Sequence, residues 1–120
     1  MSMEWAERPW GSWHVVDEGY GFKTKRIEIR PGHRLSMQRH AHRQEHWFVV
    51  FGQIQATIDG VTTTVRAGSS IDVPRGALHQ LANETLQMAM VVEVQQGIYT
   101  GEDDIERFSD DYDRQEPVGG

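Results

Sequence analysis

The 120-residue sequence contains no cysteine, which excludes disulfide bonds and thiolate metal ligands. Any metal ion must therefore be held by nitrogen and oxygen atoms. No run of about 18 apolar residues occurs, so the sequence predicts neither a membrane-spanning helix nor a membrane partner. The amino-terminal residues lack the basic and then apolar pattern of a secretion signal. Together these absences predict a cytoplasmic protein.

An excess of basic residues is also missing, because the formal net charge is −6. Residues 102–116 hold eight acidic residues against two arginines, which accounts for the whole imbalance. Proteins that bind nucleic acid need clustered lysine and arginine, so nucleic acid is not an expected partner. The length fits one domain over residues 1–120. The acidic segment 102–120 is expected to pack on this domain or to trail from it.

Short alternating segments separated by turn residues run through most of the chain. Strand-like patterns cover residues 22–30, 47–51, 54–58, 61–66, 71–73 and 86–94. Asp59 and Gly60 form a two-residue hairpin signal between two of them. No long amphipathic helix is predicted, although residues 102–108 could form one or two helical turns. The predicted fold class is all-β, a sandwich or barrel.

Apolar residues at strand spacing form the predicted core. They are Val49, Phe51, Ile54, Ala56, Ile58, Leu86, Met88, Met90 and Val92. Trp5, Trp10 and Trp13 precede the first clear strand pattern and could form an exposed aromatic arm.

Three of the six histidines, His40, His42 and His46, lie within seven consecutive residues. Because alternate residues of a strand share a face, Gln38, His40 and His42 are expected to project to one side. Glu45 breaks this parity, so we expect a turn between positions 42 and 45, with Glu45 opening a hairpin partner strand.

Gln38, His40 and Glu45 could then converge on one divalent ion, with His79 adding a fourth ligand from a later turn. Imidazole, carboxylate and carboxamide ligands suit Zn²⁺, Fe²⁺, Mn²⁺ or Co²⁺. A single histidine of this kind is more often a surface residue or a core residue with satisfied hydrogen bonds. The grouping of all four residues favours a metal site.

The same residues resemble the two sequence motifs of the cupin superfamily. The first motif is matched by Gly32, Gln38, His40, Glu45 and Gly52, and the second by Gly68, Pro74, Gly76, His79 and Asn83. Gln38 stands where the superfamily motif has its first histidine. The resemblance implies a cupin barrel, that is, a double-stranded β-helix or jelly roll. It also implies Gln38, His40, Glu45 and His79 as ligands of one divalent metal ion.

A Gln-x-His pair at this position is similar to the type II phosphomannose isomerase domain. That domain commonly forms the carboxyl-terminal part of a bifunctional mannose-1-phosphate guanylyltransferase/mannose-6-phosphate isomerase. The resemblance extends over residues 8–11, 23–27, 38–47, 101–105 and 107–108, although no Gly-rich nucleotide-binding loop occurs. It implies a metal-dependent isomerase of mannose 6-phosphate and fructose 6-phosphate, acting on a small sugar phosphate as a homodimer. Zinc is the favoured ion, with Mn²⁺, Co²⁺, Fe²⁺ and Ni²⁺ as alternatives.

Five basic or imidazole side chains are candidates for substrate chemistry. Lys25 shares a strand face with two isoleucines and is expected inside the barrel, where it would bind the sugar phosphate or transfer a proton. Arg43 and Arg75, on loops beside the metal, and Arg107, in the tail, could bind the phosphate. Each arginine is also consistent with ordinary surface charge. His42 is the first candidate for the general base, and Lys25 or a metal-bound water is the second.

Two other functions fit the same sequence. A cupin metal site with open positions can serve a metal-dependent oxygenase. A barrel that has lost its chemistry can serve as a non-catalytic sugar-binding module.

Overall fold

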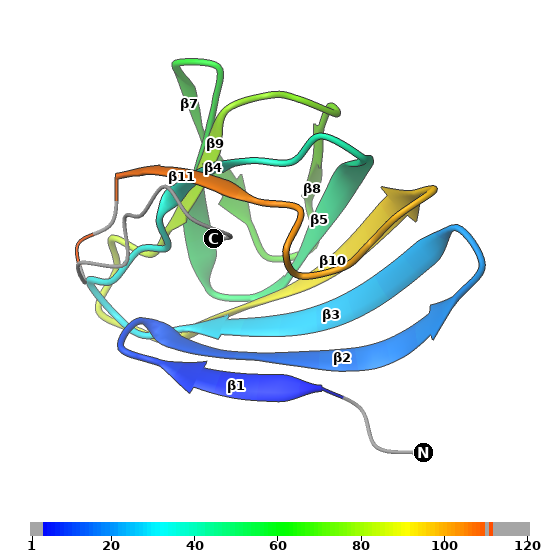
Figure 1. Ribbon diagram of the computed structural model, residues 1–120. Helices are drawn as coiled ribbons and strands as arrows, with labels where there is room; N and C mark the ends of the chain where they lie inside the picture. The colour runs from blue at the N-terminus through cyan, green and yellow to red at the C-terminus, as the bar shows by residue number, and fades with distance from the viewer. Residues whose placement is uncertain (1–3, 110, 112–120) are drawn as a thin grey trace.

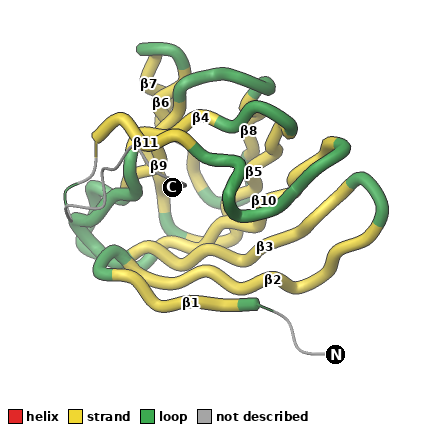
Figure 2. Tube along the Cα trace, in the orientation of Figure 1, coloured by secondary structure: helices red, strands yellow, loops and turns green. Residues whose placement is uncertain are grey.

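The computed structural model describes residues 4–109 and 111, and all of its regular structure is β-strand. The strands are β1 (Trp5–Arg8), β2 (Gly11–Gly19), β3 (Phe22–Ile29), β4 (Met37–Arg39), β5 (Arg43–Phe51), β6 (Gln53–Ile58), β7 (Val61–Arg66), β8 (Ser70–Val73), β9 (His79–Ala82), β10 (Ala89–Gly97) and β11 (Glu106–Ser109). They form a six-stranded sheet, β1-β2-β3-β10-β5-β8, and a five-stranded sheet, β11-β4-β9-β6-β7. The two sheets enclose the core (Figures 1 and 2). The all-β prediction is confirmed.

Three neighbouring strands of the six-stranded sheet divide its inner face into an apolar half and a charged half. In the register of β3, β10 and β5, Ile27 lies opposite Val91, which lies opposite Val49. Two residues further along, Lys25 lies opposite Glu93. All five side chains are buried, because alternate residues of each strand point inward. The fold therefore places charged residues inside the barrel, beside its core.

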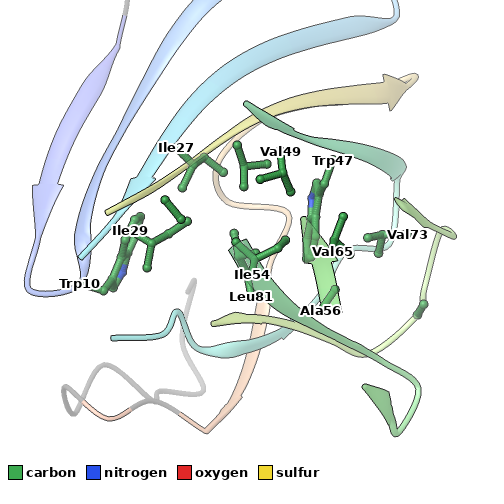
Figure 3. Packing of buried hydrophobic residues seen from close by; sticks show 13 residues of the cluster. Trp10, Ile27, Ile29, Trp47, Val49, Ile54, Ala56, Val65, Val73 and Leu81 are labelled. Carbon is green, nitrogen blue, oxygen red and sulfur yellow. The ribbon is translucent and has the colours of Figure 1, made fainter. Parts of the chain in front are cut away.

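The apolar half packs against the five-stranded sheet to form the core. Figure 3 shows Ile27, Ile29 and Val49 facing Ile54 and Leu81 across the space between the sheets. None of these five side chains is more than 4% exposed. Burial of an aliphatic side chain of this size contributes roughly 1.5–3 kcal/mol, so this half of the barrel carries the stability on which the charged half depends.

The hairpin at positions 59 and 60 is confirmed. Antiparallel β6 and β7 meet at this turn, and Asp59 and Gly60 both have positive φ, 47° and 84°. This is the conformation that a two-residue hairpin turn requires, and Gly and Asp tolerate it well.

Several expectations for the chain ends and for the core are wrong. The tryptophan-containing segment is not a free arm, because β1 and β2 form a hairpin that buries Trp10 in the core and leaves Trp5 exposed. Residues 102–108 form no helix, and β11 pairs with β4 instead. Leu86 is 94% exposed, and β10 begins only at residue 89.

The homodimer stays a prediction.

The residues expected to form one hairpin lie in opposite sheets. Because β4 belongs to the five-stranded sheet and β5 to the six-stranded sheet, the chain crosses the barrel at residues 40–42. The end of β10 packs tightly against this crossing, because a Cβ atom at Gly97 would lie 2.1 Å from the carbonyl oxygen of His42. None of the described residues belongs to a helix that could span a membrane.

Candidate metal centre

Three metal-ligating side chains converge inside the barrel from three segments. His40 follows β4, Glu45 lies on β5 and His79 opens β9. Nε2 of His40 lies 3.2 Å from Oε2 of Glu45, and Nε2 of His79 lies 4.0 Å from Oε1 of the same carboxylate. One donor atom from each residue falls within 4.8 Å of the other two, and all three residues are buried. Three of the four predicted ligands are thus brought together.

Both imidazoles present Nε2 to this cluster because Nδ1 is engaged elsewhere. Nδ1 of His40 lies 2.7 Å from the carbonyl oxygen of Asp104, and Nδ1 of His79 lies 3.0 Å from that of Ala77. A carbonyl can only accept, so each Nδ1 donates its proton to the backbone and each Nε2 is the ring nitrogen that faces the cluster. Burial, and then the positive charge of Arg43, lower the pKa of His40 to about 3. This imidazole is therefore neutral, as a metal ligand must be.

The three donors fit a divalent ion. Ligand distances of about 2.0–2.1 Å to zinc place the donors of a tetrahedral site roughly 3.3 Å apart. The separations of 3.2 and 4.0 Å, which end on the two different oxygens of Glu45, lie on either side of that value. Two imidazoles held by backbone carbonyls, with one carboxylate, are a donor set that borderline divalent ions accept.

Gln38 lies on the wall of the same cavity, and its backbone pairs with that of His79 across β4 and β9. Its Nε2 donates to Oγ of Ser36 at 3.0 Å. The amide nitrogen is therefore occupied, and the carbonyl oxygen is the end of the side chain that a cation could use.

Glu45 is held by hydrogen bonds at both carboxylate oxygens. Nε and Nη2 of Arg43 both lie 2.9 Å from Oε2, and Nε1 of Trp47 donates to Oε1 at 2.9 Å. Burial opposes ionisation, but Arg43 and then His79 outweigh it and hold the pKa of Glu45 below its usual range. Arg43 does not lie on a loop as predicted, because it is the first residue of β5 and its side chain is buried against Glu45.

A second buried carboxylate, Glu93, was missed by the sequence reasoning. Its Oε2 accepts from Nε1 of Trp47 at 3.1 Å and its Oε1 accepts from Nε2 of Gln95 at 2.6 Å. Burial, and then the neighbouring Glu45, raise the pKa of Glu93. The sequence pattern places Met90 and Val92 in the core, whereas in the structure the odd-numbered residues of β10 point inward. Because β10 has apolar residues at both odd and even positions, the sequence alone does not show which side of the strand points inward.

Two lysines of β3 meet one carboxylate of the carboxyl-terminal segment. Nζ of Lys25 lies 2.7 Å from Oε1 of Glu102, and Nζ of Lys23 lies 3.2 Å from Oε2. Lys23 also donates to the carbonyl oxygen of Thr100 at 2.7 Å. Burial opposes ionisation of Glu102, but Lys25 and then Lys23 lower its pKa. The prediction that Lys25 points into the barrel is confirmed, and its ammonium lies 4.2 Å from the centre of the Trp13 ring.

A cavity of about 200 Å³ connects these groups. Beside the three candidate metal ligands and Gln38, its lining includes Trp10, Trp13, Lys25, Arg43, Glu93, Glu102 and Arg107. It combines a candidate cation site, two carboxyl groups outside that site, and basic side chains. This arrangement can bind a small polar anion and move a proton on it.

Two candidate residues lie elsewhere. His42 does not share a strand face with His40, because β4 ends at Arg39 and residue 42 lies in the bend that crosses the barrel. Its ring is exposed and contacts Tyr99, with the two ring centres 6.2 Å apart. Arg75 is also exposed and lines a separate surface depression with Tyr20 and Gln96. Neither residue is among those that line the cavity.

Comparison with known proteins adds a family to this geometry. Residues 2–110 match the family described as mannose-6-phosphate isomerase C-terminal. The chain is 48% identical over 107 residues to the alginate biosynthesis protein AlgA of Pseudomonas aeruginosa. The aligned region makes up 89% of this chain and 22% of that protein. It is 44% identical over 107 residues to a mannose-1-phosphate guanylyltransferase of Escherichia coli, again with 89% of this chain and 22% of the relative covered. The chain thus spans about a fifth of these relatives.

Among solved structures, an RmlC-like cupin from Shewanella frigidimarina superimposes with a TM-score of 0.70 at 18% identity, covering 84% of this chain and 87% of the other. At this identity the likeness concerns the fold. The predicted double-stranded β-helix of the cupins is confirmed.

Proposed function

We propose that this chain, which belongs to the mannose-6-phosphate isomerase C-terminal family, is a metal-dependent aldose–ketose isomerase that interconverts mannose 6-phosphate and fructose 6-phosphate. The observation that carries the proposal is the convergence of His40, Glu45 and His79 in a cavity that also holds Lys25 and Glu93. An isomerase of this kind needs a Lewis acid, a proton carrier and a cationic group for the phosphate. The cavity offers a residue or a ligand set for each.

A divalent ion held by His40, Glu45 and His79, with the carbonyl oxygen of Gln38 as fourth ligand, would supply Lewis acidity toward the sugar oxygens. Zinc is the favoured ion. Asp104 and Ala77 orient the two imidazoles through their carbonyls. Arg43 and Trp47 hold the carboxylate. The ligand set is therefore positioned by the folded chain itself.

Glu93 replaces His42 as the proposed proton carrier between C2 and C1 of the sugar. It lines the cavity, whereas His42 does not. The hydrogen bonds from Trp47 and Gln95 fix the Glu93 carboxyl group, and a positioned carboxyl group of this kind contributes typically 10²- to 10⁴-fold to a rate. Transfer of the C2 proton to C1 through Glu93, together with transfer of the hydroxyl proton from O2 to O1, leaves the sugar isomerised and Glu93 unchanged.

Basic side chains of the lining would hold the phosphate at a distance from the reacting carbons. Lys25 and Arg107 line the cavity, and Arg107 lies on β11 directly opposite Gln38. The indole of Trp13 beside Lys25 offers an apolar wall for the sugar ring. Binding of the remote phosphate would supply the energy that positions the reacting carbons.

The test is turnover of mannose 6-phosphate by the purified chain, stripped of metal and reloaded with one divalent ion at a time. Formation of fructose 6-phosphate with at least one ion, and its loss in His79→Gln, would support the proposal. His46→Gln is the matched control, because His46 projects outward from β5 and bonds to Asp72. Metal binding without turnover under any ion would refute the isomerase and favour the sugar-binding module. Uptake of oxygen on candidate substrates would favour the oxygenase.

A further inference from the structure

We propose that Glu102 occupies, in the substrate-free protein, the place of the substrate's phosphate group beside Lys25, and that the arriving phosphate displaces it. Glu102 is then a built-in competitor for an anion site in the cavity. The inference rests on the proposed function for the natural ligand, a sugar phosphate. The anion site itself can be tested with inorganic phosphate.

The first observation is that two buried cations share one carboxylate of the carboxyl-terminal segment. Lys23 and Lys25 are 3% and 5% exposed, and each ammonium has three donors. Glu102 binds both of them, one through each carboxylate oxygen. Buried ammonium groups require anionic partners. A phosphate, which carries three acceptor oxygens and close to two negative charges, suits Lys25 better than a carboxylate shared with Lys23 does.

The second observation is that the two lysines are not equivalent. Lys25 and Glu102 line the cavity, and Lys23 is absent from its lining. Lys23 is instead anchored to the segment that carries Glu102, through the carbonyl oxygen of Thr100 at 2.7 Å. An anion that enters the cavity therefore meets Lys25 first. It can take the Lys25 donor while Glu102 stays bound to Lys23, so the exchange leaves no buried charge unpaired.

The charges along the cavity favour this exchange once a metal ion is bound. Of the lining residues, Arg8, Lys25, Arg43 and Arg107 are basic, and Glu45, Glu93 and Glu102 are acidic. A divalent ion adds two positive charges to this nearly balanced set. A phosphate monoester with close to two negative charges at neutral pH restores the balance.

The contact between Glu102 and Lys25 can break while the segment that carries Glu102 stays bound to the barrel. Asp104 fastens the segment independently, because its carboxylate accepts from the backbone N–H groups of Ala41 and His42 at 2.9 Å each. Its carbonyl oxygen also binds His40. The displacement therefore needs to move only the Glu102 side chain, and the orientation of the imidazole is preserved.

The experiment measures binding of inorganic phosphate to the metal-free protein by nuclear magnetic resonance, from the shifts of the Lys25 and Glu102 amides. Glu102→Gln removes the competing charge and keeps the shape. We expect it to bind phosphate roughly tenfold more tightly than the wild type, as the difference between a charged and a neutral partner implies. Lys25→Met should abolish binding in both backgrounds. Lys25→Arg, which keeps the cation, should retain it.

Glu106→Gln is the control, because Glu106 lies on the same segment and pairs with Arg39 at the surface. It should leave phosphate affinity unchanged. If Glu102→Gln binds phosphate as weakly as the wild type or more weakly, Glu102 is only a structural partner of the lysines and the inference is wrong. Tighter binding in a protein that isomerises no sugar phosphate would support the anion site and refute the proposed function, so the two failures are distinguishable.

Discussion

Replacement of Arg43 by methionine should strengthen metal binding, although Arg43 contacts two of the candidate ligands. Nη2 of Arg43 lies 3.2 Å from Nε2 of His40. Because arginine can only donate and Nδ1 of His40 carries the proton, this bond uses the one lone pair of Nε2. A metal ion needs the same lone pair. The Arg43–His40 hydrogen bond and the metal bond therefore exclude each other.

The magnitude follows from the bond that the ion must break. One hydrogen bond contributes about 0.5–1.5 kcal/mol net, so its absence should lower the dissociation constant roughly two- to twelvefold. Removal of a positive charge beside the site acts in the same direction. The metal-free variant should lose stability, because a buried carboxylate left without its partner costs about 3–5 kcal/mol. Bound metal should restore part of this loss.

The assay is titration of the metal-free protein with Zn²⁺ against a coloured chelator, with thermal unfolding measured in parallel. Arg39→Met is the matched control, because Arg39 pairs with Glu106 at the surface and does not line the cavity. If Arg43→Met folds poorly, Arg43→Lys can be used instead, because it retains the positive charge. Its zinc affinity should fall between those of the wild type and Arg43→Met. Weaker zinc binding by folded Arg43→Met than by the wild type would refute the reasoning, because Arg43 would then support the ligands rather than compete with the ion.

Three further predictions concern the site and its support. Glu93→Gln should lower isomerase turnover about 10²-fold or more, far more than His42→Ala does; the reverse order, measured with metal bound in both, would restore His42 as the base. Burial opposes ionisation of Asp104, but the amides of Ala41 and His42 hold its pKa below the usual value. Its contribution to stability is therefore complete above about pH 4 and lost as pH falls through the lowered pKa; urea unfolding of Asp104→Asn should show a smaller acid-induced loss than the wild type, and an equal loss would contradict this role. Removal of zinc by a chelator should lower the free energy of unfolding by about 2.7 kcal/mol, relative to protein in a free zinc concentration one hundred times the dissociation constant. A free energy of unfolding that does not change with zinc would exclude the metal site.

The sequence grouped the candidate metal ligands because they occupy fixed positions in two motifs, not because the expected hairpin geometry was right. His40, Glu45 and His79 lie on motif positions, and the structure brings them together. The alternation of β3 likewise placed Lys25 inside the barrel correctly, since isoleucines mark one face of that strand clearly. Where only one face of a strand is apolar, the residue types alone indicate which side chains point into the core.

The remainder depended on contacts between segments distant in sequence. Glu93 was missed because β10 has apolar residues on both faces, and only its pairing with β3 and β5 decides which face is inside. Glu102 was missed as the partner of Lys25 because 77 residues separate them. The strand order that places β4 and β5 in different sheets is also a property of the whole barrel. Neighbouring residues carry no signal for such contacts.

The two-sided apolar character of β10 has a consequence for how the barrel selects its strand alignment. A slip of β10 by one residue would turn Met90 and Val92 inward in place of Ala89 and Val91, so apolar burial alone separates the two alignments poorly. The slip would also expel Glu93 and leave buried cations opposite aliphatic side chains, at a large electrostatic cost. The charged residues that build the cavity thus also discriminate against a misaligned sheet, and substitutions that neutralise them would relax that discrimination along with the chemistry.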